Sequence, residues 1–137
     1  MKARYLIDKS ALARMPLESV RTRLAPLLES GQAATCSLID LEVLYSVRNA
    51  DEHRQVRHRR ILAYASIPMT EAIFQRAIEV QGQLAHLGQH RLPIPDLLIA
   101  ATAEAADLVV LHYDRDFERI AEVTGQAVEW VVTPGSL

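Results

Sequence analysis

Short runs of β-type apolar residues alternate along this 137-residue chain with longer amphipathic segments. The runs lie at residues 4–7, 33–36, 108–111 and 127–132. Strands separated by helices favour βα units, in which neighbouring strands are parallel and a helix covers each crossover. The alternation therefore predicts an α/β fold with a mainly parallel central sheet.

Helical periodicity is clearest after Thr70, a good N-cap residue, and stops near Gly88, a residue type common at helix C-termini. We expect a second helix to begin at Ser37. A third covers residues 96–106, and a fourth ends at Gly125. These helices provide the layers that a parallel sheet needs over its faces.

The length of the chain is that of one ordinary domain, so we predict a single domain over residues 1–137. Half of the residues are apolar and 23% are charged, which excludes a disordered or low-complexity chain. No targeting signal is evident, and even the most apolar stretch, residues 97–111, contains Glu104 and Asp107, so no membrane span is expected. A lone cysteine, Cys36, excludes an intrachain disulfide and suits the cytoplasm.

Charge is balanced, with 15 Lys and Arg against 17 Asp and Glu, so nucleic-acid binding would have to be local. The one basic patch covers residues 48–60, where Arg54, Arg57 and His58 share a helical face. Such a face could contact an RNA backbone or an acidic partner. Alternatively, it is a solvated surface with ion pairs along the helix.

Several acids interrupt apolar runs at strand ends. Asp8 directly follows the apolar run 5–7, and Asp114 and Asp116 follow the run 108–111. Open α/β folds bind their ligands at the C-terminal ends of the strands, which makes these carboxylates candidate site residues. The alternative for Asp8, and for one of the later pair, is a cap on the following helix.

Asp40 and Glu42 differ in their surroundings. If Ser37 is the N-cap, Asp40 stands at the third helical position and can complete a variant capping box. Glu42 projects from an apolar helix face instead, where an unpaired charge would be costly. We therefore interpret Asp40 as structural and Glu42 as a site residue.

Asp96 lies in the first turn of a mostly apolar helix, where its structural alternative is an interaction with the helix N-terminus worth about 0.3–1 kcal/mol. If the strands 4–7 and 108–111 are neighbours, Asp96 converges with the acids at the strand ends and with Glu42. Two carboxylates ~4 Å apart repel by about 4 kcal/mol at an effective dielectric constant near 20, so such a cluster needs protons, arginine or a metal.

An all-oxygen set of ligands selects Mg²⁺, with Mn²⁺ as a second candidate. Ions of this kind promote phosphodiester hydrolysis by activating water and by stabilising the leaving oxygen. The sequence thus points to a metal-dependent nuclease.

The chain resembles the PIN-domain nucleases, and especially the VapC ribonuclease toxins of bacterial toxin–antitoxin pairs. The resemblance spans nearly the whole chain and rests on four segments: residues 6–10, 37–42, 94–103 and 111–117. It implies a three-layer α/β/α sandwich and hydrolysis of RNA. It also implies a homodimer and a VapB-like antitoxin partner.

The resemblance further implies metal ligation by Asp8, Glu42, Asp96, Asp114 and Asp116. Ser10 matches a hydroxyl common in the family, where it could orient a ligand or a water. Lys9 and His112 depart from the family pattern, which often has Thr at the first position and Thr or Ser at the second. His112 could replace the hydroxyl as a hydrogen-bond donor, or it could be a structural histidine at a strand end.

Three alternative functions share parts of this pattern. A receiver domain needs a lysine near a late strand, but the only lysines are Lys2 and Lys9. A haloacid-dehalogenase-like phosphatase needs an acid where Ser10 stands. A catalytically silent PIN-like module that only binds RNA or a protein partner stays open, although the full set of acids argues against it.

Overall fold

The computed structural model describes residues 2–137. In chain order the elements are β1 (Tyr5–Ile7), α1 (Lys9–Leu12), α2 (Glu18–Glu29), β2 (Ala33–Thr35), α3 (Ser37–Leu44), α4 (Ala50–Ala63), β3 (Ala65–Ser66), α5 (Glu71–His86), α6 (Ile94–Ala105), β4 (Val109–His112), α7 (Arg115–Thr124) and β5 (Val128–Trp130). None of the helices in these residues is both long enough and apolar enough to span a membrane.

The strands form one sheet in the order β3-β2-β1-β4-β5, and every neighbouring pair is parallel. This confirms the predicted α/β class. Strand β1 lies between β2 and β4, so the runs 4–7 and 108–111 are neighbours, as convergence of the acids requires. Because all strands are parallel, their C-terminal ends share one edge of the sheet.

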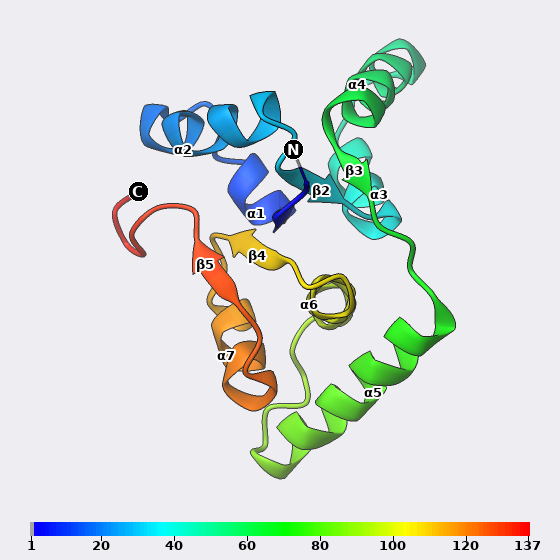
Figure 1. The fold of residues 1–137 in the computed structure, drawn as a ribbon, viewed down its shortest axis with the longest axis vertical. Coiled ribbons are helices and arrows are strands. Elements are labelled where there is room, and N and C mark those ends of the chain that lie inside the picture. Colours follow the sequence, from blue (N-terminus) through cyan, green and yellow to red (C-terminus); the bar gives the residue numbers. More distant parts are fainter. Residues whose placement is uncertain (1) are drawn as a thin grey trace.

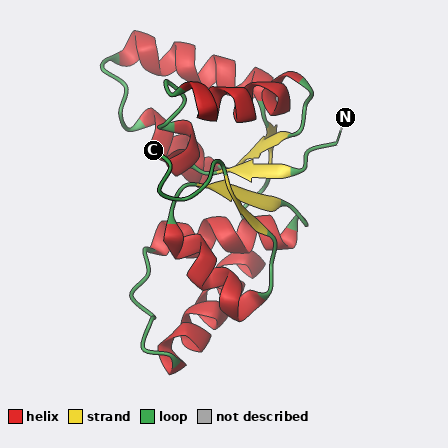
Figure 2. Ribbon diagram, turned by 90° about the vertical axis from the view of Figure 1, so that its left-hand side faces the viewer, coloured by secondary structure: helices red, strands yellow, loops and turns green. Residues whose placement is uncertain are grey.

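Helices cover both faces of the sheet, which makes the predicted three-layer sandwich (Figures 1 and 2). The alternation of side chains along β1 divides the core: Leu6 packs with α3, α5, α6 and α7, whereas Tyr5 and Ile7 pack with α1 and α2. All three side chains are buried. Burial on both sides explains why this strand reads as an unbroken apolar run.

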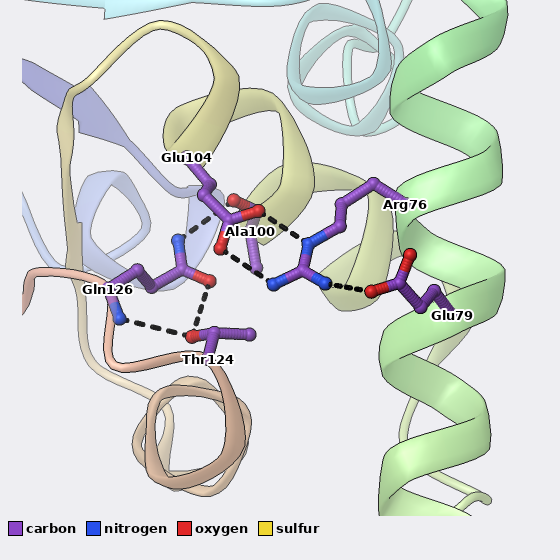
Figure 3. Close-up of polar contacts among 6 residues, drawn as sticks. All are labelled: Arg76, Glu79, Ala100, Glu104, Thr124 and Gln126. Carbon is purple, nitrogen blue, oxygen red and sulfur yellow. Dashed lines mark hydrogen bonds and ion pairs between the residues drawn. The ribbon is translucent and has the colours of Figure 1, made fainter.

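Polar contacts join the helices of the larger layer (Figure 3). Arg76 on α5 makes a bidentate pair with Glu104 on α6, at 2.7 and 3.1 Å, and a third bond to Glu79. After α7, the side-chain amide of Gln126 donates to the carbonyl of Ala100 at 2.8 Å. These bonds hold α6, which carries Asp96, against its neighbours.

Helix α3 begins at Ser37, as predicted, but its N-cap residue and the start of α6 differ from the sequence prediction. The N-cap of α3 is Cys36, not Ser37, and α6 begins at Ile94, two residues before Asp96. Asp40 therefore does not form the predicted capping box; it accepts from Arg60 Nε and from Thr35 Oγ1, both at 2.9 Å. That prediction was wrong because the partner of Asp40 lies on another helix, 20 residues away.

Candidate active site

Asp8 stands where β1 ends and α1 begins. Its Oδ2 accepts from the Ser10 amide at 2.9 Å, and its own amide donates to the Leu111 carbonyl at 3.0 Å. The side chain is therefore the N-cap of α1, and the backbone of Asp8 is anchored beside β4. The capping and site interpretations of Asp8 are compatible.

Two further acids follow β4 on the same sheet edge. Asp114 is the N-cap of α7, and its Oδ1 accepts from the Asp116 amide at 2.9 Å. Carboxylate oxygens of Asp96, Asp114 and Asp116 all lie within 4.8 Å of one another. Three carboxylates from α6 and the start of α7 thus form an acidic cluster, with Asp8 and Glu42 nearby.

Asp96 carries the strongest electrostatic signature in this cluster. Only 8% of the residue is exposed, and its Oδ2 is buried with no hydrogen-bond partner in residues 2–137. Burial, followed by the charges of Asp8, Asp114, Asp116 and Glu42, raises the pKa of Asp96 to about 8. The charges of the other four predicted acids therefore all act on Asp96.

Glu42 enters the site from α3. Its Oε1 is buried and finds no partner among the described residues. Burial and then the charge of Asp8 raise its pKa, and Lys9 opposes this shift. The pKa of Asp116 is raised by burial and by Asp114, while Arg119 lowers it from 3.5 Å away.

Ser10 and His112 brace the strand end that carries Asp114. The hydroxyl of Ser10 accepts from the Tyr113 amide at 2.9 Å. His112 is fully buried; its Nδ1 accepts from the Asp114 amide at 3.0 Å, and its Nε2 lies 2.9 Å from Glu118. Since Nδ1 is an acceptor, the ring proton is on Nε2, and burial lowers the pKa of His112 despite Glu118. Both nitrogens are engaged within the protein, which favours the structural interpretation.

The basic patch of residues 48–60 divides into paired and unpaired members. Arg48 pairs with Glu52, and Arg54 pairs with Asp51, as a solvated helix surface would. Arg60 is not on that surface, because it is buried beside Asp40. Sequence reasoning missed this role; the only local signal is the spacing of four residues to Tyr64, whose ring lies 4.4 Å from the Arg60 guanidinium. Contact of Arg54, Arg57 and His58 with RNA or antitoxin stays a prediction.

Comparison with known proteins identifies the family. Residues 5–123 match the PIN domain family, a range that includes every acid of the cluster. The chain belongs to the PIN domain family. This PIN domain is similar to ribonuclease VapC21 of Mycobacterium tuberculosis, with 49% identity over 139 residues that cover 99% of each chain. It is also similar to ribonuclease VapC51 of the same organism, with 42% identity covering 100% of this chain and 99% of the relative.

Solved structures show the same fold at low sequence identity. DNA-bound VapBC from Salmonella typhimurium matches this PIN domain with a TM-score of 0.76 and 19% identity, covering 95% of this chain and 99% of that one. VapBC2 from Rickettsia felis, bound to a promoter DNA fragment, matches with a TM-score of 0.75 and 18% identity, covering 95% and 98%. The PIN-like sandwich predicted from the sequence is confirmed.

Proposed function

We propose that this PIN domain is a Mg²⁺-dependent endoribonuclease that acts in the cytoplasm as the toxin of a VapBC-type toxin–antitoxin pair. The observation that carries the proposal is the buried, unpartnered carboxylate of Asp96 within the acidic cluster. Two findings support it: relatives named ribonuclease VapC match almost the whole chain, and the similar folds come from VapBC complexes. Those complexes support a VapB-like antitoxin as partner.

The donor set fits a small hard cation. Buried oxygens of Asp96 and Glu42 have no partner in residues 2–137, and every candidate ligand is a carboxylate. We assign the metal to the acids Asp8, Glu42, Asp96, Asp114 and Asp116, with Mg²⁺ as the ion and Mn²⁺ as a possible substitute. When bound, such an ion supplies water activation and charge neutralisation at the phosphodiester.

The protein's own part is to hold these carboxylates in place. Asp8 and Asp114 are each oriented by a backbone amide of the following helix, so neither needs the metal to fix its position. Ser10 and His112 support this arrangement by bonding to the Tyr113 and Asp114 amides. In the absence of a cation, the raised pKa of Asp96 keeps its carboxyl protonated at neutral pH and limits the repulsion within the cluster.

Cleavage of structured RNAs by the purified protein tests this proposal. We expect cutting with Mg²⁺ and none with a chelator, and loss of at least ~100-fold in rate for Asp8→Asn and Asp96→Asn. Asp51→Asn, which removes an exposed acid of α4 outside the cluster, is the matched control and should cut as wild type. Cleavage that survives both chelation and substitution would reject the metal site. Binding of RNA without cleavage under any condition would favour the silent module.

The α5–α6 surface supports the homodimer. An apolar groove of about 200 Å³ runs between these helices, lined by Phe74, Ile78, Ile94 and their neighbours. These three side chains are 41%, 59% and 65% exposed, which is unusual for such large apolar residues beside one another. We propose that a second copy of the chain covers this groove.

A further inference from the structure

A polar pocket of about 170 Å³ lies at the C-terminal ends of β2 and β3, next to the α3–α4 hairpin. Figure 1 shows these elements side by side. Six residues of the wall carry hydroxyl or guanidinium groups: Thr35, Ser37, Arg57, Arg60, Tyr64 and Ser66. Asp40 is the only acid of the wall within the described residues. Two arginines against one aspartate leave the pocket with a net positive charge.

Arg60 is a fixed part of this wall. Its side chain is only 9% exposed, its Nε donates to Asp40 at 2.9 Å, and its Nη2 donates to Thr35 Oγ1 at 3.0 Å. The guanidinium also lies against the Tyr64 ring. These two bonds use two of the five N–H donors of the guanidinium and hold it in a fixed orientation at the pocket wall.

Arg57 lies one turn earlier on α4 and lines the same pocket. It is exposed and, within the described part of the chain, forms no ion pair, whereas Arg48 and Arg54 on the same hairpin each have an acidic partner. An unpaired arginine beside a buried one, with hydroxyl groups around them, offers convergent donors to a tetrahedral anion.

The pocket and the acidic cluster share one edge of the sheet. Strand β2 pairs with β1, whose end carries Asp8, and neighbouring strands lie about 4.8 Å apart. A nucleic-acid strand bound at the acids repels them through its phosphates, so a nearby site of opposite charge would offset that repulsion. Helix α3 carries both Asp40, which lines the pocket, and Glu42 of the acid site, so the two sites flank the same helix.

We propose that this pocket is a phosphate subsite that holds the RNA backbone a few nucleotides from the bond that is cut. The inference rests on the proposed ribonuclease function and adds to it a defined contact with the substrate. Arg60 and the hydroxyls form the base of the subsite, and Arg57 closes over the phosphate from solvent. Arg54 and His58, which share the helical face of Arg57, do not line the pocket and play no part in it.

Binding of a fluorescently labelled single-stranded RNA in chelator, where no metal-dependent cutting occurs, tests the subsite. We expect Arg57→Ala to weaken binding roughly tenfold. It should also reduce the slope of log K against log salt by about 0.7, the value for one phosphate contact in a single strand. Arg59→Ala removes the same charge from an exposed position of α4 outside the pocket and should keep the wild-type slope. Equal effects of the two substitutions, or none from Arg57→Ala, would overturn the proposal.

A second arm locates the phosphate. In an RNA whose cleavage site has been mapped, single phosphates are replaced in turn by neutral methylphosphonates. One replacement near the cut should weaken binding by the wild type clearly more than binding by Arg57→Ala, because the substitution has already removed the Arg57 part of the contact. If no position behaves in this way, or if Arg57→Ala loses binding to an acidic peptide but not to RNA, the pocket is not an RNA subsite.

The subsite and the proposed function can fail separately. If the wild type cleaves RNA and Arg57→Ala binds RNA as tightly as the wild type, the subsite alone is refuted. RNA binding that depends on Arg57, in a protein that never cuts with Mg²⁺, refutes the ribonuclease and leaves the subsite as part of an RNA-binding module. Because Arg57 is exposed, loss of folding should not obscure either result, and an unchanged melting temperature checks this.

Discussion

At Asp96, burial and neighbouring negative charges both disfavour the ionised form of the carboxyl group. It is buried, one of its oxygens has no partner in residues 2–137, and its neighbours are negative. The ionised form is therefore costly when no cation is bound. Such a residue reduces the stability of the protein at neutral pH, which is the usual cost of a preorganised site.

The pKa of Asp96 predicts a pH dependence of stability. Between about pH 4 and pH 8 the folded chain holds a proton that the unfolded chain has released, so the free energy of unfolding falls as pH rises through this range. Asp96→Asn cannot ionise and should be more stable than wild type by a few kcal/mol at pH 8.5, but not at pH 4. Urea denaturation in chelator at several pH values measures this difference. Parallel pH profiles of the two proteins would contradict it.

Substitution of His112 should lower the free energy of unfolding. His112→Ala leaves the Asp114 amide without its acceptor and opens a cavity, so we expect the free energy of unfolding to fall by about 2–4 kcal/mol. His112→Asn keeps an acceptor near the Nδ1 position and should lose less. Glu118→Gln keeps an acceptor for Nε2 and serves as the control. Equal stability of His112→Ala and wild type, by urea denaturation, would exclude the bracing role.

The packing of α3 against α4 gives Asp40 and Arg60 structural roles that differ from those predicted from the sequence. Helix α4 buries one residue, Arg60, whose pair with Asp40 joins the two helices to the end of β2. Removing one partner of a buried pair of this kind typically costs about 3–5 kcal/mol. The surface pairs of Arg48 and Arg54 contribute far less, because water screens them. The buried Arg60–Asp40 pair thus links the two helices of the hairpin.

Replacement of glycine by alanine should have opposite effects on stability at two positions, one at a helix end and one inside a helix. Gly125 ends α7 at φ 73°, a left-handed conformation that costs an alanine about 1–2 kcal/mol, so Gly125→Ala should destabilise the protein by that amount. Gly82 lies within α5, and a methyl group at its Cβ position would meet nothing within 4 Å, so Gly82→Ala should stabilise by about 0.5–1 kcal/mol. Thermal unfolding of both variants measures the two signs. If both substitutions changed the stability in the same direction, local backbone conformation would not explain the effect of alanine at these positions.

At the scale of the whole molecule, the groove between α5 and α6 leaves large apolar side chains exposed. The Arg76–Glu104 pair joins α5 to α6 (Figure 3) and so helps to fix the relative position of the two helices that form the groove. A self-complementary contact between two such surfaces would bury the exposed side chains of both copies. The proposed homodimer is the simplest arrangement that does so.

If the groove is the dimer interface, a charged residue placed in it should lower the molecular mass of the protein in solution. Ile78→Glu places a charge in the groove and should convert the dimer to a monomer in light-scattering measurements. Leu62→Glu changes a residue that is even more exposed, at 74%, but lies on α4 away from the groove, and should leave the dimer intact. A wild-type protein that is monomeric, or a dimer that Ile78→Glu does not affect, would refute this interface.

The sequence alone determined the strands of the sheet core and the acids that follow them. Strands β1 and β4 are buried on both faces, so their apolar runs are visible without knowledge of the fold, and parallel strands place Asp8 and Asp114 on one edge. Strand β3 escaped prediction because its two residues are exposed and carry no apolar pattern. A helix was expected between β1 and β2, but the bounds of α2 were not predicted, since it has a Pro inside and only three buried residues.

Only the tertiary structure decided which residues meet across long stretches of chain. Asp40 looked like a local cap, but packing of α3 against α4 gave it Arg60 as a partner and turned part of a basic surface into a pocket. The raised pKa of Asp96 likewise depends on burial and on charges brought from other elements. Periodicity and capping are local properties and can be read along a chain. Burial and pairing depend on distance in space, and the fold alone sets those distances.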